Sequence, residues 1–256
     1  MAQEIDLNAD LGESFGPWTM GEDGAMLDLV SSANIACGGH AGDPEVMFRT
    51  LSEAARRGVV IGAHPGYADR EGFGRRIIPM TPPEIARLVA AQIGALQGVA
   101  ALAGAQVGYV KLHGALANLA AADTAVAEAC AKAIGRIGGL AVLAISGTTL
   151  ETVARAQGLA VHSEIFADRG YLSSGQLVPR NQAGAMIHDP DEAAVRLLAF
   201  LETGLMPVVD GAPIPLQAQS ICVHGDSAGA VAMAAMIRQK LEAAGVAIRP
   251  FLGPKP

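Results

Sequence analysis

Four of the six histidines in this chain each close a short apolar run, with glycine or proline nearby. A β-branched run that ends in a polar residue, before a turn and a helical pattern, predicts a strand that delivers a side chain to one end of an α/β core. In a β/α barrel such side chains converge, because active sites lie at the carboxyl ends of the strands. A single histidine of this kind is more often a loop anchor, whereas four repetitions favour one catalytic pocket. The four are His40, His64, His113 and His224.

The first strand-like run carries polar residues at a spacing of two. Asp6, Asn8 and Asp10 alternate with apolar residues, which places all three on one face of a strand. A first strand in a β/α protein is usually buried, so these carboxylates face the interior and need partners. We take Asp10, nearest the end of the strand, as the main general-base candidate, with Asn8 and Glu13 as substrate-binding candidates.

Lys111 and His113 stand two residues apart on another predicted strand and share its face. A lysine charge inside a barrel must be paired or used. We expect Lys111 to contact substrate, either by holding a carboxylate or by stabilising an oxyanion. The alternative is a structural ion pair with Asp10. We assign Asp10, His64, Lys111 and His113 to catalysis.

Polar residues also follow the later strands. A dense polar loop at 69–76 follows His64, and another polar segment runs from 164 to 180. Such loops are either salt-bridged surface or lids over the strand ends. Together with His40, the further substrate-binding candidates are Glu164, Asp168, Arg169, Arg180, His224 and Asp226.

A metal site stays open as an alternative. Carboxylate and imidazole groups are usual ligands of divalent cations, and Asp10, His64 and His113 would supply three of them. The chain has no His-Glu-x-x-His motif, and its histidines lie on separate predicted strands. A stand-alone metal-dependent amidohydrolase or deacetylase is therefore the second function hypothesis. A carbohydrate- or lactam-binding module without catalysis is the third.

Composition excludes several classes of protein. Among 256 residues 51% are hydrophobic and 17% charged, with a net charge of −7 and no basic-aromatic patch, so a nucleic-acid partner is not expected. Cys37, Cys130 and Cys222 have no paired spacing, which indicates buried apolar residues in a reducing compartment rather than disulfides or nucleophiles. The start of the chain lacks signal-peptide features and no run of about 18 apolar residues occurs, so we expect a cytoplasmic protein without a membrane segment.

The chain alternates strand-like and helix-like runs throughout, which predicts an α/β fold in one domain over residues 1–256. Asp210-Gly211 between short apolar runs predicts a two-residue hairpin, a small excursion near 207–217. We expect strands at 4–10, 33–37, 59–63, 107–113, 140–145, 159–164 and 219–224. We expect helices at 22–31, 43–57, 82–104, 119–137, 148–157, 190–203 and 227–244. Asp43, Thr81 and Asp189, each followed by proline, predict the starts of three of these helices.

Taken together, several of these segments resemble the LamB/YcsF family along residues 4 to 250. The resemblance rests on the motifs at 6–13 (Asp-Leu-Asn-Ala-Asp-Leu-Gly-Glu), 33–44, 62–67 (Gly-Ala-His-Pro-Gly-Tyr), 69–76, 110–116 (Val-Lys-Leu-His-Gly-Ala-Leu), 164–169 and 223–226 (Val-His-Gly-Asp).

The resemblance implies a seven-stranded β/α barrel of the glycoside hydrolase/deacetylase type. It also implies ATP-dependent hydrolysis of the lactam 5-oxo-L-proline to L-glutamate, in a 5-oxoprolinase complex with two further subunits. The chain has no phosphate-binding Gly-Lys-Ser/Thr loop and no Gly-x-Gly-x-x-Gly after a strand, so ATP would bind at a site shared with or supplied by those partners. A homo-oligomer is compatible with the sequence.

Four positions depart from the usual family pattern. Gly39 stands where Phe is common, Ala68 and Leu112 where Pro is common, and Ala117 where Tyr is common. These changes predict a roomier pocket wall or a different substrate. The polar set is otherwise intact.

Overall fold

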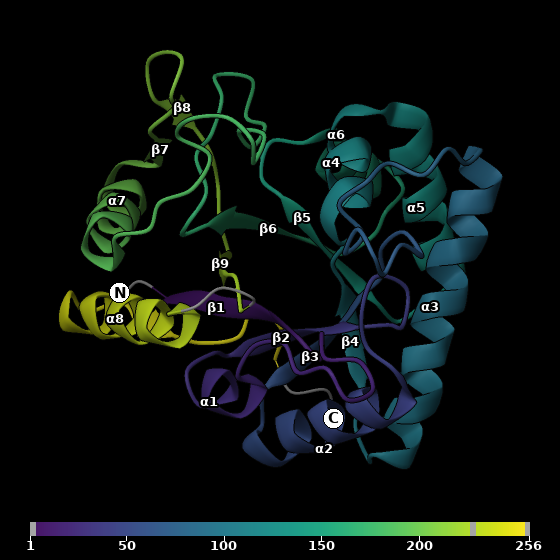
Figure 1. The fold of residues 1–256 in the computed structure, drawn as a ribbon. Coiled ribbons are helices and arrows are strands. Elements are labelled where there is room, and N and C mark those ends of the chain that lie inside the picture. The colour runs from purple at the N-terminus through teal and green to yellow at the C-terminus, as the bar shows by residue number, and fades with distance from the viewer. Residues whose placement is uncertain (1–3, 226–228, 254–256) are drawn as a thin grey trace.

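Seven parallel strands close into a barrel in the computed structural model, which describes residues 4–225 and 229–253 (Figure 1). The strands pair in the order β1-β2-β3-β4-β5-β6-β9, and β9 returns to β1 to close the ring. The predicted seven-stranded α/β barrel is therefore confirmed. Its strands are β1 (Glu4–Leu11), β2 (Ser32–Ala36), β3 (Val60–His64), β4 (Val107–Val110), β5 (Ala141–Ile145), β6 (Val161–Phe166) and β9 (Ser220–Val223).

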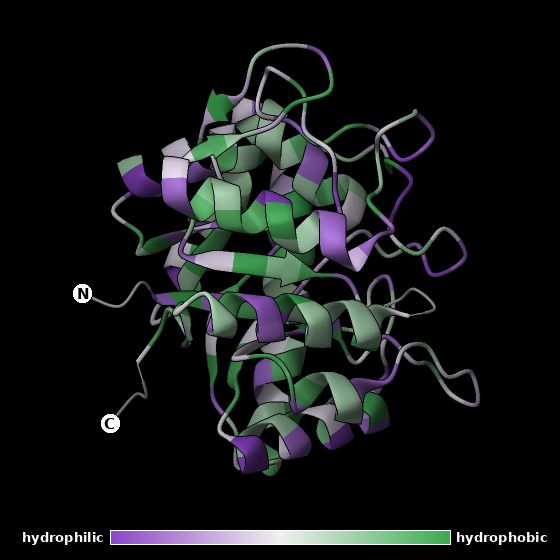
Figure 2. Ribbon diagram, turned by 90° about the vertical axis from the view of Figure 1, so that its left-hand side faces the viewer, coloured by the Kyte–Doolittle hydropathy of each residue, from purple (hydrophilic) through white to green (hydrophobic). Residues whose placement is uncertain are grey.

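Helices surround the barrel, and each buries one stripe against it. In α2 the buried residues Val46, Met47, Leu51 and Ala54 recur at helical spacing, which gives one apolar face. Figure 2 shows both hydrophobic and hydrophilic residues on the helices around a mainly hydrophobic sheet. The helices are α1 (Asp23–Leu27), α2 (Pro44–Arg57), α3 (Pro82–Leu102), α4 (Gly114–Ala122), α5 (Thr124–Ile137), α6 (Thr149–Ala156), α7 (Pro190–Thr203) and α8 (Ala230–Ala243).

Short polar signals set the starts of the long helices. Asp43 accepts hydrogen bonds from two backbone N–H groups at the start of α2, and Asp189 accepts one at the start of α7. The backbone N–H of Thr81 donates to Glu84 Oε2 at 2.7 Å before α3. In all three helices proline occupies the first turn, as the sequence predicts.

The prediction of one helix is wrong, because the structure has two helices there and the first begins earlier than predicted. The sequence predicts a single helix at 119–137, but α4 begins directly after His113 and ends before Asp123, where α5 starts. Gly114 has a φ of 54°, so the chain turns sharply enough to begin a helix there. Asp123 accepts a hydrogen bond from the N–H of Val126 at 3.0 Å and thereby caps a new helix inside the predicted one.

The hairpin excursion exists, but its turn is longer than predicted. β7 (Leu205–Met206) pairs antiparallel with β8 (Ile214–Pro215), so the connection spans 207–213 rather than two residues. Asp210 does not close a tight turn, because its carboxylate accepts hydrogen bonds from the N–H and hydroxyl of Ser173. An eighth strand that the sequence did not predict, β10 (Ala247–Ile248), pairs parallel with the start of β1.

Helix α3 is the one helix in the described chain that is long and apolar enough to cross a membrane by length and composition. In this fold it packs against α2, α5, β3 and β4. Its buried residues Ile85, Val89, Ile93 and Leu96 lie three or four positions apart. That pattern is typical of a helix laid against a barrel.

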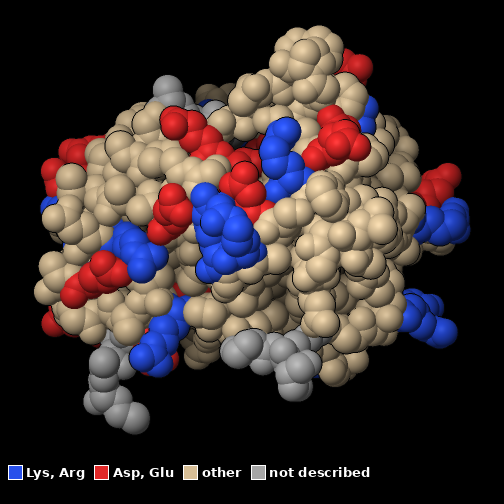
Figure 3. Space-filling view, turned by 90° about the horizontal axis from the view of Figure 1, so that it is seen from below, with Lys and Arg blue, Asp and Glu red and all other residues tan. Residues whose placement is uncertain are grey.

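Charged side chains of both signs are interspersed on the face seen from below. Figure 3 shows Lys and Arg beside Asp and Glu there, with no extended field of one sign among the described residues of this face. Among the described ion pairs of the chain, Arg57 lies 2.8 Å from Asp28 and 2.9 Å from Glu53. Phosphate backbones require clustered cations, which this face does not offer.

Candidate functional site

A pocket opens at the carboxyl ends of the barrel strands and has a volume of about 450 Å³. Its position matches the end of the barrel at which β/α enzymes place their active sites. A volume of this size suits a small molecule. The charged and imidazole groups that line it are Asp10, Glu13, His64, Arg75, Lys111, His113, Glu164, Arg169, Arg180 and His224.

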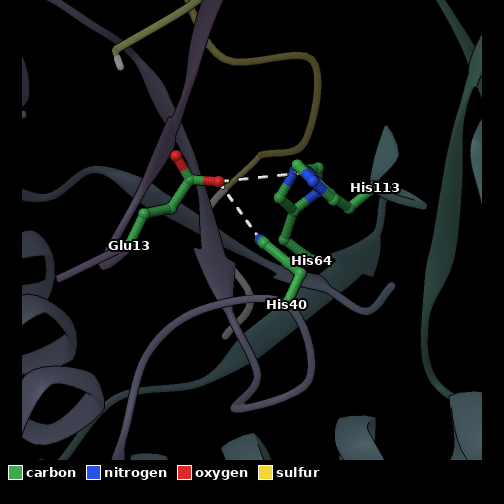
Figure 4. Close-up of side chains that lie close together, drawn as sticks. All are labelled: Glu13, His40, His64 and His113. Carbon is green, nitrogen blue, oxygen red and sulfur yellow. Dashed lines mark hydrogen bonds and ion pairs between the residues drawn. The ribbon is translucent and has the colours of Figure 1, made fainter. Parts of the chain in front are cut away.

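One wall of the pocket is a cluster of one carboxylate and three imidazole rings. Glu13, His40, His64 and His113 each offer one ligand-type atom, and these four atoms lie within 4.8 Å of one another (Figure 4). Glu13 Oε1 lies 3.1 Å from His40 Nε2 and 3.9 Å from His113 Nδ1. All four side chains are buried.

The rings of this cluster are held by backbone and by one another. His64 Nδ1 lies 2.9 Å from the carbonyl oxygen of Lys111, and His113 Nε2 lies 2.8 Å from the carbonyl oxygen of Phe73. The rings of His40 and His113 stack with centroids 3.6 Å apart. Burial lowers the pKa of His113 to about 3 and that of His40 well below its ordinary value, so both rings are neutral near pH 7.

Deeper in the barrel, Lys111 bridges two carboxylates. Its Nζ lies 2.9 Å from Asp10 Oδ1 and 3.1 Å from Glu164 Oε2, and all three side chains are buried. Burial alone would raise the pKa of Asp10, but the neighbouring ammonium of Lys111 helps to hold it well below its ordinary value. Burial lowers the pKa of a lysine, yet Asp10 and Glu164 keep that of Lys111 well above its ordinary value. Asp10 is therefore an ionised group at the floor of the pocket.

The opposite wall carries a chain of three polar side chains. Asp168 Oδ2 lies 2.8 Å from His224 Nδ1, and Arg180 donates to His224 Nε2 at 3.1 Å. Since Arg180 can only donate, the ring proton of His224 lies on Nδ1, and this N–H donates a hydrogen bond to Asp168. Unlike Arg180, Arg169 donates hydrogen bonds from its guanidinium to the backbone carbonyl oxygens of Val178 and Ala185. Arg180 and His224 face the pocket from this side.

Comparison with known proteins places the chain among well-matched relatives. The profile of the LamB/YcsF family matches residues 5–255. The chain belongs to the LamB/YcsF family. It is 51% identical to the A-type subunit of a 5-oxoprolinase from Gluconobacter oxydans, over 97% of this chain and 98% of that protein. It is also 51% identical to the corresponding protein of Azorhizobium caulinodans, over 96% and 98%. A lactam utilization protein of Thermus thermophilus has the same fold, with a TM-score of 0.91, 42% identity, and coverage of 97% of this chain and 100% of that one.

In this LamB/YcsF chain the structure brings the candidate residues of the described part to one end of the barrel. Asn8 lies beneath the pocket, where its amide contacts Glu164 and Ser220. Asp168 and His40 stand behind pocket residues, whereas the other described candidates line the cavity itself. Asp226 lies outside the described residues.

Sequence reasoning missed two residues of the site, Arg75 and Asn34. Arg75 lines the pocket, and its guanidinium lies 4.8 Å from the centre of the Phe73 ring. Asn34 donates to Asp10 Oδ1 at 2.8 Å and accepts from the hydroxyl of Tyr109 at 2.6 Å. Asn34 could have been found as a polar residue inside an apolar strand, at the spacing of two that singled out Asp10 on the first. Arg75 had only its place in a polar loop to mark it.

The departures at Gly39 and Ala68 do not enlarge the pocket of this LamB/YcsF member. A Cβ on Gly39 would lie 2.4 Å from Gln92 Oε1, so the Gln92 side chain already fills this space. Gln92 is fixed in turn, since its amide pairs with the N–H and the carbonyl of Gly66. Ala68 is exposed, away from the cavity. Only Leu112 and Ala117 of the four positions line the pocket.

The cysteines are buried thiols, as the sequence predicts. Cys37, Cys130 and Cys222 are all free and buried. Burial raises the pKa of Cys37 and of Cys130 to about 12. Cys222 accepts a hydrogen bond from Lys111 Nζ at 3.0 Å, and its pKa is also raised well above the ordinary value by burial. A neutral buried thiol is a poor nucleophile.

Proposed function

We propose that this chain is the lactam-binding subunit of a 5-oxoprolinase, which hydrolyses 5-oxo-L-proline to L-glutamate coupled to ATP hydrolysis. The observation that carries the proposal is the pocket at the strand ends, which is lined by the ionised Asp10 and by the arginines Arg75 and Arg180. The relatives named as 5-oxoprolinase subunits support a hydrolase role across the full length of the chain. Their name also supports a complex with further subunits.

The substrate has two features that the pocket can recognise. Its carboxylate can pair with an arginine that lines the cavity: Arg180, which is held by His224, or Arg75. Its lactam carbonyl is a poor electrophile until its oxygen is activated, for example by phosphoryl transfer from ATP. Asp10, held ionised beside Lys111, is the group we assign to accept a proton from the attacking water.

This assignment changes the role expected for Lys111. Its ammonium already contacts Asp10 and Glu164 within the protein. We therefore assign the substrate carboxylate to Arg180 and give Lys111 the task of holding Asp10 in place. ATP binding falls to the partner subunits or to a site shared with them, in a cytoplasmic complex.

The experiment is reconstitution with the two partner subunits, measuring glutamate release with and without ATP. We expect turnover only when the three subunits and ATP are present. Full activity of the isolated chain without ATP would overturn the proposal. It would instead favour a stand-alone metal-dependent amidohydrolase, a second candidate that the cluster of Glu13, His40, His64 and His113 supports.

Two variants test the assigned roles within that complex. Arg180→Met should raise KM for the lactam by roughly 10- to 100-fold, because a charge-assisted hydrogen bond contributes about 1.5–3 kcal/mol. Arg155→Met, which removes a half-exposed arginine paired with Glu151, is the matched control and should change neither KM nor kcat. Asp10→Asn should lower kcat by about 10²- to 10⁴-fold. Unchanged kcat in a folded Asp10→Asn enzyme would remove Asp10 from catalysis.

A further inference from the structure

Two imidazole nitrogens in the pocket wall, His64 Nε2 and His113 Nδ1, face each other closely. His64 Nδ1 and His113 Nε2 each meet a backbone carbonyl, which can only accept, so each of these nitrogens carries the ring's proton. In the neutral rings the other nitrogens, His64 Nε2 and His113 Nδ1, present lone pairs, and they lie 3.0 Å apart. Two lone pairs at this distance repel unless a positive species lies near both.

Carboxylate oxygens increase this need for positive charge. Glu13 Oε1 lies 3.9 Å from His113 Nδ1, and Asp10 Oδ2 lies 3.3 Å from His64 Nε2. Lys111 is directed to the Asp10–Glu164 side of the barrel. The electron-rich atoms of the cluster thus converge on one point at the pocket wall (Figure 4).

We propose that this cluster binds one divalent transition-metal ion of the zinc class, with Glu13 Oε1, His40 Nε2, His64 Nε2 and His113 Nδ1 as its ligands. Ligand atoms at about 2 Å from a tetrahedral ion stand about 3.3 Å apart. The separations of 3.0, 3.1 and 3.9 Å within the cluster bracket that value. Imidazole-rich sites select zinc and its neighbours over magnesium or calcium.

Hydrogen bonds from the second nitrogen of His64 and of His113 fix the tautomer and orientation that a metal-binding histidine needs. Phe73 has a φ of 52°, a strained conformation for a residue other than glycine, and its carbonyl accepts the proton of His113 Nε2. Metal-binding histidines usually donate their second N–H in this way, which fixes the tautomer. His40 Nε2 donates its proton to Glu13 Oε1, and His40 Nδ1 has no hydrogen-bond partner among the described residues, so Nδ1 can take this proton when a metal ion binds at Nε2.

The proposed site is open on one side. Glu13, His64 and His113 line the pocket, whereas His40 stands behind them. The ion would therefore face the cavity, with room for a water molecule or a substrate oxygen as a further ligand. This ligand set differs from the one that the sequence suggested, because Glu13 and His40 take the place of Asp10.

The test uses the isolated chain, without partner subunits, ATP or lactam, so its outcome does not depend on the proposed function. Chain stripped with a chelator is titrated with Zn²⁺ by calorimetry and with Co²⁺ by visible absorption. We expect one ion per chain and a Co²⁺ spectrum typical of nitrogen and oxygen ligands. Histidine ring resonances in NMR should shift on Zn²⁺ addition for His40, His64 and His113, but not for the exposed His188.

Variants locate the ion. His64→Gln and His113→Gln should each weaken Zn²⁺ binding by about 100-fold or more, and Glu13→Gln by at least about 10-fold. His188→Gln is the matched control and should bind like the unmodified chain. The absence of stoichiometric Zn²⁺ or Co²⁺ binding by the unmodified chain would overturn the proposal and leave a shared proton as the positive species. Undiminished binding by a folded His64→Gln/His113→Gln double variant would also overturn it.

Discussion

Strand β1 and the loop after it deliver carboxylates to both ends of the barrel, and the surroundings of these carboxylates differ between the two ends. At the amino end of the strand, Asp6 accepts hydrogen bonds from the hydroxyls of Ser31, Ser32 and Ser220. At the carboxyl end, Glu13 meets ring nitrogens of His40 and His113. Both carboxylates are buried. The partners of Asp6 are donors, whereas the cluster around Glu13 is rich in acceptors.

The contrast separates a structural polar layer from a functional one. A buried group with all its donors in place stabilises the fold and needs no further partner. At the carboxyl end, the facing nitrogens of His64 and His113 provide the place at which we propose an additional cation. Asp10 lies between these extremes, because Lys111 and Asn34 satisfy it while it still lines the pocket. Each of the three levels holds a carboxylate, so the partners decide the role.

The largest expected effect comes from removing the lysine that pairs with Asp10, between the two ends of the barrel. Lys111→Met should lower the free energy of unfolding by about 3–5 kcal/mol, because it leaves Asp10 and Glu164 buried without their shared cation. Chemical denaturation monitored by circular dichroism measures the loss. Lys132→Met, on the exposed face of α5, is the control and should change stability little. A Lys111→Met protein as stable as the control would show that the two carboxylates do not need this lysine.

Asp6, at the amino end of β1, should make the free energy of unfolding depend on pH. Burial raises the pKa of Asp6 from its ordinary value of 3.8 to about 6, so between these values the folded chain holds a proton that the unfolded chain releases. The contribution of Asp6 to the free energy of unfolding therefore falls as pH rises from about 4 to 6, by up to about 3 kcal/mol. Denaturation at several pH values should show this fall in the unmodified chain and its loss in Asp6→Asn. An identical slope in both proteins would contradict the assignment.

The smallest effect compares two buried tyrosines. The hydroxyl of Tyr109 donates to Asn34 beneath the pocket, whereas that of Tyr67 has no hydrogen-bond partner in the described chain. Tyr109→Phe should cost about 1–3 kcal/mol, because it leaves the Asn34 oxygen unsatisfied. Tyr67→Phe should be neutral or slightly stabilising. Equal losses in thermal denaturation of the two variants would mean that the polar layer under the site does not depend on this hydrogen bond.

Much of the fold followed from local patterns in the chain. The apolar runs and the capping signals at Asp43, Thr81 and Asp189 predicted the barrel strands and the starts of three long helices, because these depend on neighbours in sequence. The division at Asp123 and the long turn around Asp210 were not predicted. In both cases the aspartate accepts a hydrogen bond that a pattern of apolar residues does not reveal. Asp123 accepts from the backbone N–H of Val126, and Asp210 accepts from Ser173.

The sequence alone was enough to indicate which residues stand at the ends of the strands. It thereby indicated the acids, histidines and lysine of the candidate site. Their pairing could be known only from the folded barrel. Lys111 turns to Asp10 and Glu164 rather than to the open cavity, and Gln92 fills the space beside Gly39. These contacts join side chains from segments far apart in the chain, which closure of the barrel brings within hydrogen-bond distance.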